Sequence, residues 1–83
     1  MKITFKLFAS LRDYLPEGAT NYILELEVDE GTTPADLAER YHLPPKLTHL
    51  VLINGHYLPP EKRASTALVD GDVLAIWPPI AGG

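Results

Sequence analysis

The sequence contains no cysteine, so neither a disulfide nor a thiol contributes to its structure or chemistry. This excludes a thiol nucleophile and a cysteine-ligated zinc site, and it fits a reducing compartment. No apolar run approaches the roughly 20 residues that span a bilayer, and the N-terminal residues begin an alternating pattern in place of a secretory hydrophobic region. We therefore expect a soluble cytoplasmic protein.

Positive charge is also scarce in this chain. The 83 residues include 7 Lys and Arg against 11 Asp and Glu, which gives a formal net charge of −4. The basic residues are scattered, and the sequence therefore lacks the Lys/Arg clusters that attract phosphate backbones. Nucleic-acid binding is accordingly disfavoured. A chain this short forms one domain, which must be stabilised by efficient packing of its core.

Apolar residues recur with two different periods, and together they predict a single α+β domain at residues 1–77. A period of two indicates strands, and helical spacing indicates short helices on one face of a sheet. Asn54-Gly55 lies between apolar segments, which is typical of a hairpin with a type I′ turn. The predicted strands are residues 2–8, 21–28, 50–53, 56–58 and 73–77, and the predicted helices are residues 9–15 and a segment from residue 34 that stops before residue 44.

Faces and boundaries are predicted for two further elements. Residues 21–28 alternate so that Tyr22 shares a face with Leu24 and lies opposite to two glutamates. The segment from Thr33 to Asp36 is a typical helix start. It offers a capping threonine, a proline at the first helical position and an aspartate in the positive first turn.

Alternation also predicts which aromatic side chains point away from the helices. In the first strand, Phe8 falls on the same face as Lys6 and opposite to Leu7. In the last strand, Trp77 lies opposite to Ile76 and is predicted to project outward as well. If these two strands pair, the two rings meet at the base of the C-terminal tail. Exposed aromatic rings of this kind are typical of a protein interface, with packing under an edge loop as the alternative.

Residues 78–83 are predicted to form an extended tail. Pro78 and Pro79 fix two φ angles and make a semi-rigid stalk, whereas Gly82 and Gly83 lack the Cβ atoms that would block a narrow channel. A terminal carboxylate is ionised at neutral pH and is a poor electrophile, so chemistry there requires activation, usually as an acyl-adenylate. The alternative is an inert, frayed end.

The remaining polar residues do not suggest an intrinsic active site. The three histidines lack the spacing of metal ligands, and no serine or threonine has an accompanying base. Asp70 and Asp72 flank Gly71, a combination that favours a turn over a catalytic carboxylate pair. The sequence therefore predicts no metal site and no catalytic apparatus of its own.

Three motifs together resemble the small subunit of molybdopterin synthase. Leu7-Phe8-Ala9 is followed by Leu11-Arg12, Asp70-Gly71-Asp72 lies near the last strand, and the chain ends with Trp77-Pro78-Pro79-Ile80-Ala81-Gly82-Gly83. The resemblance spans almost the whole chain, and the final motif is its most specific part. Trp77 replaces the more common phenylalanine before the two prolines, and residues 59–67 form a longer loop than in typical members.

The resemblance implies a ubiquitin-like β-grasp fold and a non-catalytic sulfur carrier. An E1-like enzyme would adenylate Gly83 with ATP and Mg²⁺, and a sulfurtransferase persulfide would convert the adenylate to a thiocarboxylate. The tail would then enter the large subunit and donate sulfur to precursor Z, which builds the dithiolene of molybdopterin. The residues implied to contact the large subunit are Gly82, Ala81, Ile80, Pro79, Pro78, Trp77 and Phe8, with Tyr57 or Leu58 as a third member of the docking surface.

Two alternatives remain open at the level of the sequence. The first keeps the carboxylate chemistry but changes the acceptor to tRNA thiolation, thiamine, cysteine synthesis or conjugation to protein lysines. Thiamine carriers are disfavoured because they are shorter and lack the first motif. The second alternative is a β-grasp interaction module with an inert tail, which predicts that deletion of Gly82 and Gly83 leaves function intact.

Overall fold

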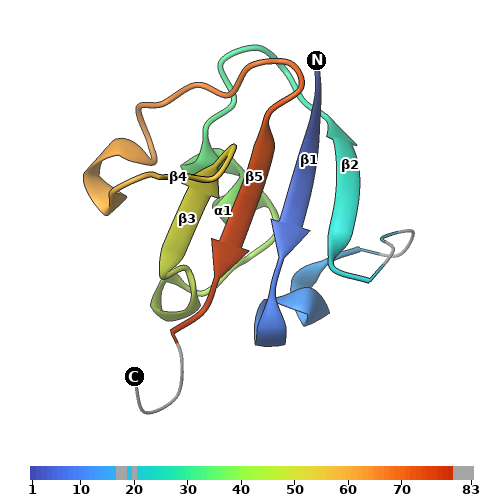
Figure 1. Cartoon of the computed structure of the whole chain (residues 1–83), viewed down its shortest axis with the longest axis vertical. Helices are drawn as coiled ribbons and strands as arrows, with labels where there is room; N and C mark the ends of the chain where they lie inside the picture. The colour runs from blue at the N-terminus through green and yellow to red at the C-terminus, as the bar shows by residue number, and fades with distance from the viewer. Residues whose placement is uncertain (17–18, 20, 80–83) are drawn as a thin grey trace.

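The computed structural model describes residues 1–16, 19 and 21–79, and these residues form a twisted mixed sheet with helices on one face (Figure 1). The strand order is β2-β1-β5-β3-β4. The two central strands, β1 and β5, run parallel, whereas the other neighbours are antiparallel. The strands are β1 (Lys2–Leu7), β2 (Ile23–Glu27), β3 (Leu50–Ile53), β4 (His56–Tyr57) and β5 (Val73–Trp77).

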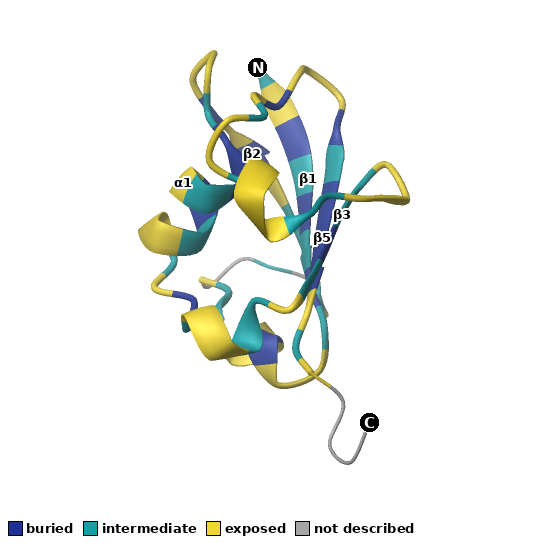
Figure 2. Cartoon of the chain, turned by 90° about the vertical axis from the view of Figure 1, so that its left-hand side faces the viewer, coloured by how far each residue is buried: buried dark blue, intermediate teal, exposed yellow. Residues whose placement is uncertain are grey.

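The α-helix α1 (Pro34–Arg40) crosses one face of the sheet, as the side view shows (Figure 2). Three 3₁₀ helices complete the described elements: η1 (Ala9–Tyr14), η2 (Pro45–Leu47) and η3 (Pro60–Lys62). This arrangement is the β-grasp fold, so the predicted α+β class is confirmed. None of the described helices combines the length and apolar character that crossing a bilayer requires.

Most predicted boundaries hold to within one or two residues, and the differences have local causes. The first strand ends at Leu7 because Ala9 adopts a φ of 52° and turns the chain out of the sheet. The short helix predicted after it is the 3₁₀ helix η1. The loop predicted at residues 59–67 contains η3, which begins after Pro59.

The start of α1 follows from its capping residues. The side chain of Thr33 accepts a hydrogen bond from the Asp36 backbone N–H at 3.1 Å, and the Asp36 carboxylate accepts one from the Thr33 N–H at 3.0 Å. This reciprocal pair satisfies N–H groups that lack a partner inside the helix. The predicted start is confirmed. The helix ends before His42, whose φ of 59° is incompatible with its continuation.

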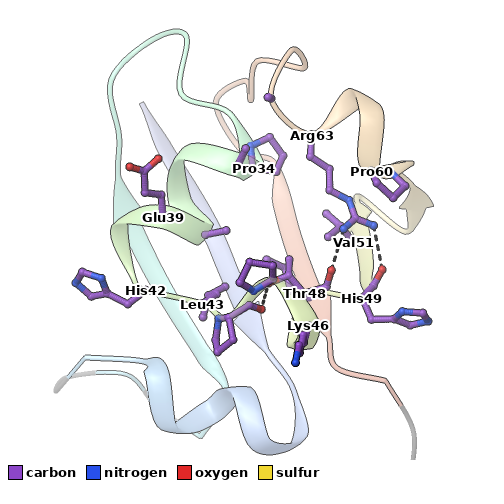
Figure 3. A pocket seen from close by; sticks show the side chains of 16 residues that line it. Pro34, Glu39, His42, Leu43, Lys46, Thr48, His49, Val51, Pro60 and Arg63 are labelled. Atoms are coloured by element: carbon purple, nitrogen blue, oxygen red, sulfur yellow. Dashed lines mark hydrogen bonds between the residues drawn. The ribbon is translucent and has the colours of Figure 1, made fainter.

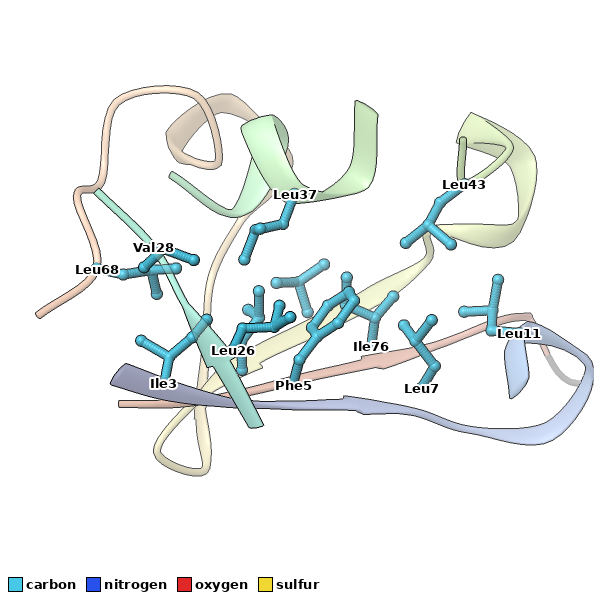
Figure 4. Close-up of a cluster of buried hydrophobic side chains, with 12 residues drawn as sticks. Ile3, Phe5, Leu7, Leu11, Leu26, Val28, Leu37, Leu43, Leu68 and Ile76 are labelled. Carbon is cyan, nitrogen blue, oxygen red and sulfur yellow. The ribbon is translucent and has the colours of Figure 1, made fainter. Parts of the chain in front are cut away.

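The core lies between α1 and the inner face of the sheet (Figure 4). The alternating residues of β1 and β5 supply its centre, and Phe5 also packs against Tyr41 with ring centroids 5.4 Å apart. Burial of large aliphatic side chains is the main stabilising contribution in a domain without disulfides. The core residues are Ile3, Phe5, Leu7, Leu11, Leu26, Val28, Leu37, Leu43, Val51, Leu68, Leu74 and Ile76.

A polar network closes one end of the sheet. Asn54 and Gly55 have φ values of 52° and 82°, which confirms the predicted type I′ hairpin. The Asn54 side chain donates to the buried Asp72 carboxylate at 2.8 Å and accepts from the Val73 N–H at 2.9 Å. The network therefore ties the hairpin to the turn that leads into β5.

Candidate functional site

The aromatic pair predicted at the base of the tail is present. The rings of Phe8 and Trp77 stack with centroids 3.7 Å apart and planes 2° from parallel. The sheet register produces this pair: Leu7 lies opposite Ile76 in the parallel β1–β5 pairing, so the next residues along both strands meet on the other face. The Phe8 N–H also donates to the Ile76 carbonyl at 3.1 Å.

The turn after β1 fixes the position of Phe8. Phe8 keeps an extended backbone with φ −104° and ψ 159°, and the next residue, Ala9, has a φ of 52°. For a residue with a Cβ atom, this left-handed conformation costs roughly 1–2 kcal/mol. The Leu11 N–H donates to the Phe8 carbonyl at 3.1 Å and closes the turn. Because Leu11 is fully buried, the core holds the segment that carries Phe8.

Tyr22 extends the stack, and here the prediction was wrong. Its ring lies 4.8 Å from that of Phe8, on the outer face, instead of beside Leu24. The strand begins only at Ile23, and Asn21 has a φ of 57°, so the alternation does not reach Tyr22. The asparagine was the available signal, because asparagine tolerates the left-handed conformation of a turn.

Two leucines of β3 continue this outer surface. Leu50 lies opposite Trp77, and Leu52 lies opposite both Ala75 of β5 and Tyr57 of β4. Trp77 keeps 38% of its surface exposed and Tyr57 keeps 56%, so large apolar side chains remain open to a partner. The resulting surface, here called the apolar face, comprises Tyr22, Phe8, Trp77, Leu50, Leu52 and Tyr57.

The structure separates the two candidates for the third docking residue. Tyr57 belongs to the apolar face, whereas Leu58 packs against the core on the inner side of the sheet. The Leu58 N–H donates to the Val51 carbonyl at 2.8 Å, which extends the pairing one residue beyond β4. Geometry therefore groups Tyr57 with Phe8 and Trp77 and does not bring Leu58 to them.

The tail leaves the sheet directly beside the stacked rings. The Trp77 carbonyl accepts a hydrogen bond from the His49 N–H at 3.2 Å, which anchors the last residue of β5. Pro78 is half-buried and Pro79 is exposed. The remaining predicted tail residues, Ile80, Ala81, Gly82 and Gly83, lie outside the described residues. The described part of the site is thus an apolar surface that adjoins the base of the tail.

The other polar candidates have structural partners or lie apart. Asp70 accepts from the Lys2 N–H at 2.7 Å, and Asp72 accepts from the Val69 N–H at 2.8 Å, which confirms the turn interpretation. Within residues 1–16, 19 and 21–79, no three His, Asp or Glu side chains gather as possible metal ligands. Among the described residues, the candidate site is therefore the apolar face beside the base of the tail.

Comparisons with known proteins identify one family for this chain. The model of the ThiS family matches residues 5–83. The crystal structure of SAMP1 from Haloferax volcanii is similar with a TM-score of 0.68 and 26% identity, over 100% of both chains. The putative molybdopterin converting factor subunit 1 from Pyrococcus furiosus is similar with a TM-score of 0.66 and 25% identity, over 95% of this chain and 98% of the other.

A further similar structure is a complex of subunits 1 and 2 of the molybdopterin-converting factor from Helicobacter pylori. Its matching chain has a TM-score of 0.60 and 18% identity over 100% of both chains, which shows the fold alone. A search of curated proteins gave no significant match.

Proposed function

Because the chain belongs to the ThiS family, we propose that it is a sulfur carrier that acts as the small subunit of a molybdopterin synthase. The observation that carries the proposal is the stack of Phe8 on Trp77 at the point where the tail begins. A rigid aromatic anchor beside the tail allows a partner to bind the domain and to receive the tail in one fixed direction. The proposed contact residues in the tail are Pro78, Pro79, Ile80, Ala81 and Gly82.

The apolar face has the composition of a docking site. Aromatic side chains dominate the energetics of many interfaces, because they bury much area and lose little conformational freedom on binding. Here Trp77 is already held by Phe8 before any partner arrives. A pre-ordered side chain lowers the entropy cost of association. We propose that Trp77, Phe8 and Tyr57 together contact the large subunit.

The proposed chemistry occurs at the Gly83 carboxylate and is supplied by partners. The carboxylate attacks the α-phosphorus of ATP in an E1-like enzyme that uses Mg²⁺, and pyrophosphate leaves. A persulfide sulfur from a sulfurtransferase then displaces AMP, and a thiol reduces the resulting acyl disulfide to the thiocarboxylate. Because the carrier only presents its terminus, we propose that it is non-catalytic. We place it in the cytoplasm, because ATP and thiols are abundant there.

The proposed acceptor is precursor Z bound to the large subunit. Support comes from the similarity to the molybdopterin converting factor subunit 1 of Pyrococcus furiosus. A second candidate is protein modification, which is favoured by the similarity to small archaeal modifier protein 1. Both candidates use the same activated carboxylate and differ only in what receives the acyl group or the sulfur.

Intact mass spectrometry tests the carrier function. The protein is incubated with an E1-like enzyme, ATP, Mg²⁺ and a persulfide donor. We expect a gain of about 16 Da, because one carboxylate oxygen is replaced by sulfur. Deletion of Gly83 serves as the control. An unchanged mass with an enzyme that loads another carrier under the same conditions would refute the proposal.

A second experiment separates the two acceptors. Thiocarboxylated protein is mixed with the large subunit and precursor Z in one reaction. In the other, unmodified protein is mixed with the E1-like enzyme, ATP, Mg²⁺ and a lysine-containing acceptor protein, so that the lysine amine can displace AMP from the acyl-adenylate. Formation of the dithiolene supports the proposed function. Formation of an amide adduct alone assigns the chain to protein modification.

A further inference from the structure

A groove lies over the inner face of the sheet, between α1 and the η3 segment (Figure 3). Its volume is about 900 Å³, and its floor includes the buried side chains of Val51 and Ile76. Ala35 and Ala38 of α1 form one wall, and Ala64, after η3, lies on the other. The groove exists because these small side chains leave space over the sheet that larger residues would fill.

Arg63 fixes the walls of the groove relative to one another. Its guanidinium donates to the carbonyl oxygens of Leu58, Thr48 and His49 at 3.2, 2.9 and 2.9 Å. Its own carbonyl accepts from the Ala35 N–H of α1 at 3.0 Å. The hydrogen bonds of one residue therefore connect the η3 segment, the start of β3 and the helix. A preformed apolar concavity of this kind is typical of a binding site.

The charge of the groove differs from that of the protein. Lys46 and Arg63 line it, together with the single carboxylate of Glu39, whereas the chain as a whole has a net charge of −4. The three acceptors of the Arg63 guanidinium are neutral carbonyl oxygens, so these bonds leave its positive charge uncompensated. The apolar concavity thus lies in a locally cationic region of an acidic protein.

We propose that this groove binds an apolar segment of a partner protein that carries acidic residues beside its apolar anchors. The apolar side chains occupy the space over Val51 and Ile76, and a carboxylate lies near Lys46. Charge complementarity with Lys46 and Arg63 favours an acidic segment as the occupant, and the test below distinguishes a partner from a second copy of this chain.

The groove and the apolar face are on opposite sides of the same sheet, so they can be occupied together. Ile76 contributes to the groove floor and its neighbour Trp77 contributes to the apolar face. A partner in the groove therefore leaves the stacked rings free. The two sites can be inactivated separately, and a failure of one proposal does not affect the other.

Selection from a library of random dodecapeptides displayed on phage, with the full chain as bait, tests the proposal. We expect the enriched peptides to combine apolar and acidic residues. A synthetic copy of one enriched peptide is then titrated into isotope-labelled protein. Saturable chemical-shift changes are expected at Ala38, Val51 and Ala64 and not at Trp77.

Variants localise the binding. Lys46→Glu should lower the affinity for the selected peptide about tenfold, because it places a negative charge where the peptide carboxylate binds. Lys62→Glu makes the same charge change at an exposed residue that does not line the groove and should have less than a twofold effect. Ala38→Trp should abolish binding by filling the groove, and Trp77→Asp should not affect it.

Three outcomes would overturn the proposal. The first is an enriched set without acidic residues, and the second is equal weakening by Lys46→Glu and Lys62→Glu. The third is concentration-dependent dimerisation of the free protein that Ala38→Trp abolishes, which would assign the groove to a second copy. Because Lys46 is exposed, Lys46→Glu is expected to fold. The comparison of its peptide affinity with that of Lys62→Glu therefore tests the proposal even if Ala38→Trp does not fold.

Discussion

Ile76 and Trp77 are consecutive residues of β5, yet their side chains lie in opposite environments. Ile76 is completely buried in the core, whereas Trp77 keeps 38% of its surface exposed and stacks on Phe8. Period-two alternation of a strand between a covered face and an open face produces this contrast. The two positions therefore offer a matched pair for testing which side chains stabilise the fold.

Ile76→Ala should lower the free energy of unfolding by about 3 kcal/mol, because it leaves a cavity between the sheet and the helices. Trp77→Ala should lower it by only about 1 kcal/mol, the contribution of the lost aromatic pair. Urea denaturation followed by circular dichroism measures both values. Equal losses in the two variants would mean that Trp77 belongs to the core.

If the proposed docking holds, Phe8→Asp and Trp77→Asp should each weaken binding to the large synthase subunit by about 2 kcal/mol, or roughly thirtyfold, because a charge would be buried in the proposed interface. Val69→Asp is the matched control, since Val69 is an exposed apolar residue, at 60%, outside the apolar face. Titration calorimetry gives the affinities. Comparable weakening by Val69→Asp would contradict the assignment of the docking surface.

Asp72→Ala should destabilise the fold by about 2 kcal/mol. The buried carboxylate accepts from the Asn54 side chain and the Val69 N–H, and both donors lose their partner. Asp13→Ala, at an exposed residue, should change stability by less than about 0.5 kcal/mol. The unfolding midpoints of the two variants give the two stability losses. If Asp72→Ala loses no more stability than Asp13→Ala, Asp72 has no structural role.

Arg63→Lys should destabilise the protein by about 2 kcal/mol although it keeps the charge. A lysine ammonium cannot reproduce the planar fork that reaches three carbonyl oxygens. In this variant, the hydrogen-exchange rates of the Ala35 amide and of the amides at the start of β3 should increase. Unchanged exchange at these sites would show that the walls of the groove are held by packing alone.

Thr33→Ala should cost about 1 kcal/mol, because the N-cap acceptor of α1 is lost. Thr33→Ser retains the hydroxyl oxygen and should cost less than half as much. Thermal denaturation compares the two variants. Equal losses would indicate that the buried methyl group, and not the cap, stabilises the helix.

Local patterns predicted much of this molecule. Alternation placed Phe8 and Trp77 on the outer face, and Asn54-Gly55 defined the hairpin, because each depends on residues adjacent in sequence. Tyr22 and Leu58 were harder to assign. The left-handed turn at Asn21 breaks the alternation before Tyr22, and Leu58 continues the pairing beyond the two residues of β4. In each case one residue at a strand end decides the face.

The role of Arg63 could not be predicted, because its partners lie 5, 14 and 15 residues away and are backbone carbonyls. Any sequence supplies such carbonyls, so no residue type marks the contact. The groove is a consequence of the same long-range arrangement. Its small residues belong to separate segments that meet only when the helix and the η3 segment pack over the sheet.

The parallel pairing of β1 with β5 also has a consequence for biosynthesis. β1 is synthesised before the other described strands and must wait for β5, the last of them, before the centre of the sheet can close. Contacts between residues so far apart in sequence form late and slowly. A nascent chain interrupted before residue 73 would therefore lack both a closed sheet and the stacked rings, and a partner that docks on those rings would not recognise it.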